Sequence, residues 1–328
     1  MPRLERNLLK PVQQRLIVIG DIILDKYVTG RSTRLSPEAP VPIISIDSAP
    51  EYRLGGAANV AANIKSLGGN PVLISRINAY GESQEFANLL HENLIEGCLV
   101  HTKTALPVKT RIIANHQQIA RLDYEETTPL THTEEQLIIQ QLDAYSQDAC
   151  GIVVSDYAKG LLTIRVLQAV ENCAAKYKLP VFLDPKITAG KPTALMFPTL
   201  ITPNLHEAEE ISKIKITDSV ITLDRACVAI ADKYGAKIVL ITRGDKGMSI
   251  WRQGILTSFA TVARDVYDVS GAGDTVIAAM ALALCSEWSF EYSVGIANHA
   301  AGIVVGKRGT STVSLDELNA ALEKEASV

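Results

Sequence analysis

Residues 265–276 read Asp-Val-Tyr-Asp-Val-Ser-Gly-Ala-Gly-Asp-Thr-Val. The apolar run at 276–284 follows at once and predicts a helix, which places the small residues 271–273 at its N-terminus and Asp274 in its first turn. Backbone N–H groups at a helix N-terminus have no partner within the helix, and the helix dipole adds positive potential. The stretch therefore predicts an anion site suited to a phosphoryl group, beside a carboxylate that can accept a proton from an attacking hydroxyl group. A helix simply capped by Ser270 or Asp274 after a glycine-rich turn explains Gly-Ala-Gly equally well.

The composition excludes several classes of protein. Of the 328 residues, 47% are apolar and 21% are charged, which suits a well-buried core in one large α/β domain or two smaller ones. A net charge of −4 argues against a nucleic-acid partner, which would need a basic face. The longest apolar runs, such as 276–285, are too short to span a bilayer, and residues 1–6 adjoin no apolar signal region.

The cysteines indicate the compartment. There are five, scattered along the chain and never in a Cys-x-x-Cys pair: Cys98, Cys150, Cys173, Cys227 and Cys285. An odd, dispersed set argues against a disulfide framework and against a zinc site, so these are expected to be small core residues. We therefore expect a cytoplasmic protein with no nucleic-acid and no membrane partner.

Short apolar runs alternate with helical patterns along most of the chain. Strands are predicted at 15–20, 71–75, 150–156, 180–184, 199–204 and 237–242, and helices at 55–69, 83–93, 162–177 and 289–325, the last broken at 306–309. This alternation predicts a mostly parallel sheet with helices on both faces. Polar residues gather where the strands end, so we expect a shared cleft at that edge.

Two β-rich segments, 26–54 and 106–124, lie outside this alternation. The first contains the proline-rich stretch 36–42, which is unfit for a central strand. The second contains two β-like runs separated by 115–117. We expect both segments to form one small projecting sheet, whose open edges would favour a dimer that covers them.

Two groups of polar residues near the amino terminus are candidates for the cleft. Asp21 and Asp25 follow the first strand at the end where open α/β sheets bind ligands, although solvated acids in a turn would look the same. Asn59 and Asn63 lie four residues apart on one face of a small, apolar helix. Buried amides there would need partners, although an alanine-rich helix packed closely on the sheet is the simpler interpretation.

Two strings in opposite halves of the chain together resemble the signatures of the ribokinase-like (PfkB-type) sugar kinases. They are 55–69, which begins Gly-Gly-Ala-Ala-Asn, and 268–275, which reads Asp-Val-Ser-Gly-Ala-Gly-Asp-Thr. A departure from the pattern is Val269-Ser270, where many members carry two threonines. The resemblance implies a three-layer α/β/α fold with the small sheet as a lid, which would exclude water from the transferring phosphoryl group.

The resemblance also assigns roles to individual residues. Asp274 would be the general base, with Gly271, Ala272 and Gly273 stabilising the transferring group. The residues expected to contact the sugar are Asp21, Asp25, Gly55, Gly56 and Asn59.

ATP is expected without a P-loop, since no Gly-x-x-x-x-Gly-Lys-Ser/Thr occurs, and no Gly-x-Gly-x-x-Gly follows the first strand as in a dehydrogenase. Asn204-Leu205-His206-Glu207 matches the family's Asn-x-x-Glu motif, associated with Mg²⁺ and the ATP phosphates. Glu207 acting through water suits an ion that retains several waters, although an N-cap with Glu at the third helical position fits the same string. By resemblance, Thr242, Arg243 and Gly244 border the nucleotide, Asn298 and Gly302 line the adenine wall, and K⁺ is the candidate for a monovalent-cation site at Asp268 and 306–311.

Further strings indicate a phosphorylated sugar. The segments 34–42, 122–126, 155–160, 184–186, 202–205 and 305–313 are similar to the branch of the family that phosphorylates D-glycero-β-D-manno-heptose 7-phosphate, and this similarity runs from about residue 12 to 322. The existing phosphate must meet cations, and the candidates are Arg34, Lys109, Arg111, Arg121, Lys159 and Lys186. Lys159 and Lys186 follow strand ends that face the cleft, and Asp184 is expected beside them in the substrate site.

Because the chain ends at Val328, we expect a single kinase domain over residues 1–328, without the nucleotidyltransferase domain that follows this kinase in many bacteria. Two alternatives stay open. The same scaffold phosphorylates ribose, fructose phosphates, adenosine or vitamins in other members. A catalytically idle nucleotide or sugar-phosphate sensor would keep the binding residues, although the intact Asp274 argues against it.

Overall fold

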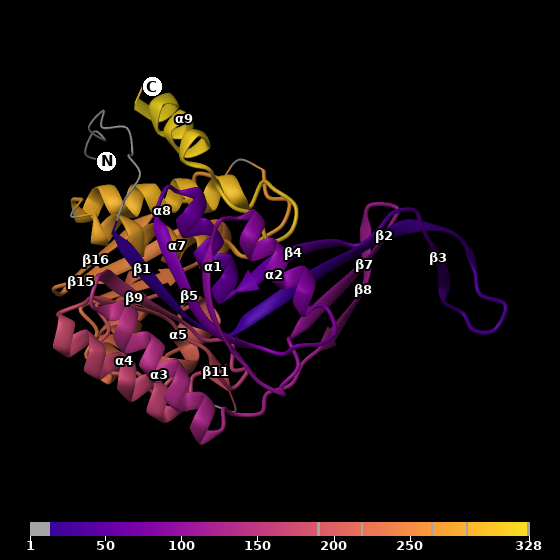
Figure 1. Cartoon of the computed structure of the whole chain (residues 1–328). Helices are drawn as coiled ribbons and strands as arrows, with labels where there is room; N and C mark the ends of the chain where they lie inside the picture. Colours follow the sequence, from indigo (N-terminus) through magenta and orange to yellow (C-terminus); the bar gives the residue numbers. More distant parts are fainter. Residues whose placement is uncertain (1–13, 189–190, 218, 264, 287, 327–328) are drawn as a thin grey trace.

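Alternating burial along the first strand sets the layers of the molecule. In β1 (Arg15–Gly20), Leu16 and Val18 join one hydrophobic core, and Ile17 and Ile19 join a second. Successive side chains of a strand point to opposite faces, so this sheet is covered on both sides. The computed structural model describes residues 14–188, 191–217, 219–263, 265–286 and 288–326 (Figure 1). Residues 1–6, on which the expectation about a signal region depends, lie outside them.

The main sheet has nine strands within the described residues, in the order β16-β15-β14-β13-β10-β9-β1-β5-β6. All neighbours pair in parallel except β14, β15 and β16, which pair antiparallel at one edge. The mostly parallel sheet is thus confirmed. Besides β1, the strands are β5 (Asn70–Ile77), β6 (Glu96–His101), β9 (Ala149–Ser155), β10 (Val181–Asp184), β13 (Leu200–Ile201), β14 (Ile238–Thr242), β15 (Met248–Arg252) and β16 (Ile255–Phe259).

Helices cover both faces of this sheet, which confirms the three-layer α/β/α arrangement (Figure 1). The first core contains residues of α1 (Ala57–Ser66), α2 (Ser83–Glu92), α7 (Ala272–Cys285), α8 (Phe290–Val304) and α9 (Leu315–Ala326). The second contains residues of α3 (His132–Ser146), α4 (Ile164–Tyr177), α5 (Leu205–Ser212) and α6 (Val220–Tyr234). A 3₁₀ turn, Gly244–Lys246, and a short hairpin of β11 (Ile187–Thr188) and β12 (Lys191–Pro192) complete the elements.

A second, five-stranded sheet projects from the body of the molecule, as predicted (Figure 1). It consists of β2 (Ile22–Leu35), β3 (Pro42–Ile46), β4 (Glu51–Gly56), β7 (Val108–Ala114) and β8 (Gln117–Tyr124). We call it the lid sheet. Its first segment begins at Ile22 rather than at 26, because the apolar residues 22–24 pair with β4 as far as Gly56. Asp25 therefore lies within a lid strand, and Gly55 and Gly56 end a strand instead of opening the helix.

The helix that follows the 265–276 stretch is buried on nearly all sides. In α7 the residues from Asp274 to Ala283 are all buried, and the helix packs between α1 and α8. The described part of the chain contains no helix with the length and apolar character needed to cross a membrane. All five cysteines fall within it and are free, three of them buried. The long apolar run is therefore the central helix of one core layer.

Candidate active site

The N-terminus of α7 has an open side. Gly271 caps the helix with φ 80°, the left-handed region that glycine tolerates best. A Cβ atom there would lie 2.6 Å from Asn59 Nδ2, so Gly271 is also required by close packing. At Gly273, by contrast, no atom lies within 4 Å of where a Cβ would stand. The turn is thus closed toward α1 and open where an anion would approach the helix dipole.

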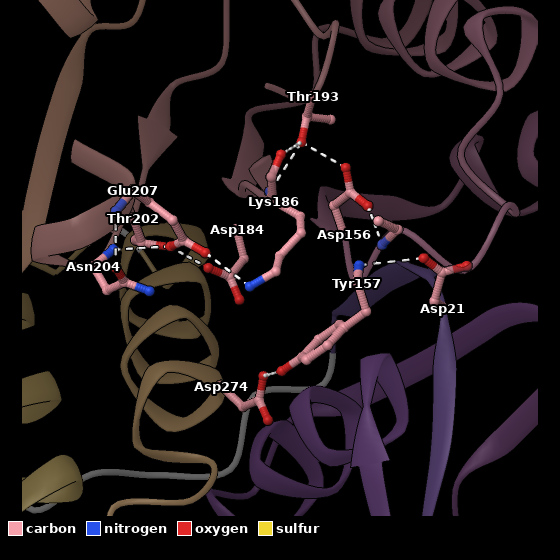
Figure 2. A network of polar contacts seen from close by, with 11 residues as sticks. Asp21, Asp156, Tyr157, Asp184, Lys186, Thr193, Thr202, Asn204, Glu207 and Asp274 are labelled. Atoms are coloured by element: carbon pink, nitrogen blue, oxygen red, sulfur yellow. Dashed lines mark hydrogen bonds and ion pairs between the residues drawn. The ribbon is translucent and has the colours of Figure 1, made fainter. Parts of the chain in front are cut away.

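Asp274 is buried and held from two sides. Its side chain accepts a hydrogen bond from Asn59 Nδ2 at Oδ2 and from the Tyr157 hydroxyl at Oδ1, each 2.7 Å long. Figure 2 shows the second of these. Burial raises the pKa of Asp274 to about 6, although these two hydrogen bonds act in the opposite direction. The carboxylate is therefore ionised at neutral pH yet basic enough to accept a proton.

The two family-like strings meet in space. Asn63 donates from Nδ2 to the Asn59 backbone oxygen at 2.9 Å, and Thr275 donates from Oγ1 to Asn63 Oδ1 at 3.0 Å. The prediction that Asn59 and Asn63 share a face and need partners is confirmed, and those partners belong to α7. The contact of Asn59 with a sugar hydroxyl stays a prediction, because the structure shows its amide bound to the carboxylate of Asp274.

Asp21 organises the loop after β9. Its carboxylate accepts three backbone hydrogen bonds, from Tyr157 at 3.2 Å, Lys159 at 2.9 Å and Leu161 at 3.1 Å. Burial raises the pKa of Asp21 above its ordinary value, against the effect of these amides. The contact of Asp21 with the sugar stays a prediction. The loop that its carboxylate holds in place contains Tyr157 and Lys159.

Asp25 forms a buried ion pair with Arg111, one of the predicted phosphate-binding cations. Both belong to the lid sheet, on the adjacent strands β2 and β7. The second oxygen of Asp25 accepts a hydrogen bond from Thr310 Oγ1 at 3.1 Å. A Cβ at Gly55 would lie 2.8 Å from that oxygen, so the glycine leaves room for the carboxylate. The charge of Arg111 is therefore already paired within the protein, with the Asp25 carboxylate.

A second acidic group lies at the ends of β10 and β13. Asp184 is close to both Asp274 and Glu207, and burial followed by these two charges raises its pKa well above the ordinary value. Lys186 Nζ donates to Glu207 Oε1 at 3.3 Å (Figure 2). A cavity of about 370 Å³ opens beside them, lined by Lys186, Ile187, Asn204, His206, Glu207 and Glu210. Two of the lining residues, Glu207 and Glu210, are acids, and a cavity lined by acids favours a cation.

The Asn204–Glu207 string forms the helix cap that was the alternative interpretation. Asn204 Oδ1 accepts from the Glu207 backbone N–H at 2.9 Å, and Glu207 Oε2 accepts from the Asn204 N–H at 3.1 Å. The cap uses one oxygen of Glu207 and leaves Oε1 to Lys186 and the cavity. The two interpretations are thus compatible.

The residues predicted to border the nucleotide lie at the end of β14 and in the turn after it, and on the helices α5 and α8. Arg243 donates to Ser249 Oγ at 3.0 Å, and Gly244 has open space where a Cβ would stand. Asn298 is buried on α8 and donates to the Ala260 carbonyl oxygen at 2.8 Å. Gly302 packs so closely that a Cβ would lie 2.8 Å from Val262 Cγ2. The other residues of this set are Thr242, which ends β14, and Leu205, which is 38% exposed.

Asp268 joins the loop before α7 to the loop after α8. It accepts hydrogen bonds from the Ser270 and Gly309 N–H groups, each 2.9 Å long. Although partial burial acts to raise it, these amides hold the pKa of Asp268 below its ordinary value. The structure therefore brings an anionic carboxylate and the 306–311 loop together at the predicted cation site.

The structure separates the predicted phosphate-binding cations. Lys159 pairs with Glu125 at 2.6 Å, and Arg121 pairs on the exposed face of β8 with Asp123. Arg34 is exposed, one residue before the end of β2. The side chain of Lys109 forms no hydrogen bond or ion pair with any described residue, and its ammonium lies 6.0 Å from the centre of the Tyr157 ring. Burial lowers the pKa of Lys109 below its ordinary value, although the nearby charges of Asp25 and Glu125 act to raise it.

Sequence reasoning missed the central position of Tyr157. It stands in the 155–160 string, which was assigned only to the substrate branch. Asp156, the first residue after the buried strand β9, was also missed. Asp156 accepts from Thr193 Oγ1 at 2.6 Å, and burial raises its pKa to about 6 (Figure 2). The available signal was a tyrosine and an acid directly after a buried strand, at the edge where ligands bind.

Comparisons with known proteins identify the family of the chain. The model of a family described as pfkB family carbohydrate kinase matches residues 13–318. Bifunctional protein HldE of Azorhizobium caulinodans is 40% identical over 316 residues, which are 95% of this chain and 65% of that protein. The protein of the same name from Helicobacter pylori (strain G27) is 37% identical over 308 residues, 93% of this chain and 65% of that one. The chain thus spans about 65% of the length of these relatives.

Solved structures share the fold. Phosphofructokinase-2 from Escherichia coli in complex with potassium is 20% identical, with a TM-score of 0.78 over 97% of this chain and 100% of that chain. Ribokinase from Arabidopsis thaliana complexed with ribose and ATP is also 20% identical, with a TM-score of 0.71 over 95% of this chain and 99% of that one. At this identity the similarity concerns the architecture alone.

Proposed function

The chain belongs to the pfkB family of carbohydrate kinases, and we propose that it transfers the γ-phosphoryl group of ATP to the C1 hydroxyl of D-glycero-β-D-manno-heptose 7-phosphate. The products are heptose 1,7-bisphosphate and ADP, a step toward ADP-heptose for the lipopolysaccharide inner core. The observation that carries the kinase reaction is Asp274, a buried, hydrogen-bonded carboxylate in the first turn of a helix whose N-terminus is open. The assignment of the substrate rests on the sequence segments that are similar to the heptose-phosphate branch, which run through nearly the whole chain. It also rests on the HldE relatives, the first of which matches 95% of the chain.

Asp274 orients the acceptor hydroxyl and takes its proton. Each carboxylate oxygen has a second lone pair free for the substrate, since Asn59 and Tyr157 each occupy one. The amides of 271–273 then meet the negative charge that spreads over the transferring group. Because a general base contributes about 10²–10⁴-fold and one anion-hole donor about 2.7–4 kcal/mol, these two groups account for much of the protein's part in the reaction.

A divalent cation fits the acidic group beside the cavity. Mg²⁺ prefers oxygen ligands, and Glu207 supplies a carboxylate at the wall of the cavity, acting through water, with the Asp184 side chain near Glu207. No group of three or more His, Cys, Asp or Glu side chains among the described residues could hold a metal alone, so the ATP phosphates and waters would complete its ligands. When bound, the ion would neutralise charge on the β- and γ-phosphates. For the monovalent cation, we propose that K⁺ binds at Asp268 and the 306–311 loop.

Lys109 is the cation proposed to meet the phosphate that the sugar already carries. It is half-buried on β7, opposite Asp25 of β2 in the strand pairing, and its side chain forms no ion pair with any described residue. We expect Lys109→Met to raise KM for the sugar phosphate at least about tenfold, because a charge-assisted hydrogen bond contributes about 1.5–3 kcal/mol. Steady-state kinetics with Arg121→Met as the matched control, a cation already paired with Asp123, measures this. A rise in KM for ATP alone would show that Lys109 meets the γ-phosphate instead.

The lid sheet is the proposed dimer interface. Apolar side chains are exposed on it, including Leu35 at 66%, Ile46 at 62% and Leu122 at 58%. A soluble protein covers such edges and patches more often than it leaves them in water. We expect sedimentation to give the mass of a dimer, and Leu122→Lys to shift it toward the monomer. A wild-type monomer at micromolar concentration would contradict this interface.

The experiment that tests the substrate is a sugar panel. ADP release is measured with ATP, Mg²⁺ and either heptose 7-phosphate, fructose 6-phosphate or ribose. We expect heptose 7-phosphate to have the highest kcat/KM by at least about tenfold, since each 1.4 kcal/mol of differential binding gives that factor. A preference for ribose or fructose 6-phosphate would replace the heptose substrate, and binding without turnover would favour the sensor.

A further inference from the structure

We propose that Tyr157 is a positioning residue for the phosphoryl-transfer base, which connects the loop anchored by Asp21 to the carboxylate of Asp274. This inference rests on the proposed kinase activity and adds a residue to it. Neither the family-like signatures nor the predicted site residues include Tyr157. Figure 2 shows its ring spanning the distance between the two acids, with its main chain at Asp21 and its hydroxyl at Asp274.

The direction of the hydrogen bond follows from the chemistry of the two groups. The Tyr157 hydroxyl and Asp274 Oδ1 are 2.7 Å apart, and an ionised carboxylate can only accept. Burial, followed by the nearby charges of Asp274 and Asp184, raises the pKa of Tyr157 well above its ordinary value. The phenol therefore keeps its proton over the working pH range and donates it. Together with Asn59 it holds the carboxylate in one orientation, so that the remaining lone pairs face the substrate.

The main chain of Tyr157 is fixed independently of its side chain. The Asp21 carboxylate accepts the amides of Tyr157, Lys159 and Leu161, which folds the loop around a single buried acid. Within this loop Ala158 has φ 55°, a conformation that alanine seldom adopts without such external support. The strain is maintained at the residue directly after Tyr157, which indicates that the position of this tyrosine is closely specified.

The ring has a second neighbour with a role in the site. The Lys109 ammonium lies over it, 6.0 Å from the ring centre, on the lid side. One residue thus touches the base, the loop held by Asp21 and the lysine proposed to meet the sugar phosphate. A sugar that binds between Lys109 and the loop would therefore contact Tyr157, the residue that orients the base.

The test is the pH profile of kcat for Tyr157→Phe, which removes only the hydroxyl group. Loss of a donor to an ionised carboxylate disfavours its charged form, so the acidic limb, expected near pH 6 in the wild type, should move upward by about one pH unit. Tyr157→Phe should also lower kcat about tenfold with KM for ATP unchanged. The matched control is Tyr145→Phe, which removes a hydroxyl that donates to Glu96 at 2.8 Å on the surface.

Further variants and measurements separate the possible outcomes of this test. If Tyr157 only fills space, Tyr157→Phe will keep the wild-type profile and Tyr157→Leu will be the impaired variant, and the inference is then wrong. If Asp21 acts through Tyr157, Asp21→Asn will lower kcat in the wild-type background and have little further effect in Tyr157→Phe, since coupled residues are not additive. Multiplying effects would refute the connection to Asp21. Absence of wild-type turnover with every sugar would contradict the proposed function itself, and equal thermal midpoints of the variants would establish that each is folded.

Discussion

Replacing Asp274 with asparagine should lower kcat at least about a hundredfold while ATP still binds with wild-type affinity. The change is nearly isosteric and removes the one carboxylate in the first turn of α7, so the acceptor hydroxyl loses its proton acceptor. Asparagine can still accept the hydrogen bond from Tyr157, and the Asn59 amide, once turned over, can accept from its new N–H₂ group, so the helix N-terminus should keep its shape. Single-turnover phosphoryl transfer measures the chemical step, and equilibrium titration measures ATP binding.

The matched control for this variant is Glu291→Gln. Glu291 is also an acid in the first turn of a helix, α8, but it is exposed. Its loss removes only a favourable interaction with the helix dipole, about 0.3–1 kcal/mol of stability, and should leave kcat unchanged. A Asp274→Asn variant with a rate near that of the wild type would remove Asp274 from its role.

The second large effect concerns stability. Asp25→Ala should lower the free energy of unfolding by about 3–5 kcal/mol, because it leaves the buried Arg111 guanidinium without its counter-ion. The side chains of this pair are only 4% and 11% exposed, respectively. Chemical denaturation gives the free energy directly, provided that the transition is two-state.

Two comparisons make the stability test specific. Asp47 pairs with Arg31 on the surface of the same sheet, where the side chains are 44% and 75% exposed, so Asp47→Ala should cost less than about 1 kcal/mol. Adding Arg111→Met to Asp25→Ala should recover part of the loss, since the unpaired buried charge is then gone. Equal losses for Asp25→Ala and Asp47→Ala would show that the buried pair contributes nothing special.

The sequence predicted the layers and the position of Asp274 in the first turn of a helix because these depend on local patterns. The apolar run before Gly20 and the glycine-rich turn before α7 each determine an element and its end within a few residues. The lid boundary was placed too late because β2 continues directly from β1, and only the pairing of residues 22–24 with β4 reveals this. Strand pairing between distant segments is not encoded in the pattern of one segment.

The polar connections of the site were harder to predict. Asn59 was expected at the sugar, and its hydrogen bond to Asp274 was not foreseen; Arg111 was expected at a phosphate, but its charge neutralises Asp25. Residue type fixes which groups need partners, whereas the three-dimensional packing decides which partner lies within reach. The role of Tyr157 depends on the same packing, because its two contacts come from opposite halves of the chain.

The most direct measurement of the central claim is the ³¹P NMR spectrum of the product formed from ATP, Mg²⁺ and heptose 7-phosphate. We expect one new sugar-phosphate resonance, coupled to the anomeric proton, in step with ADP, and its loss with the Asp274→Asn variant. A phosphate placed on any other hydroxyl, or the same product formed at an undiminished rate without the Asp274 carboxylate, would contradict the account.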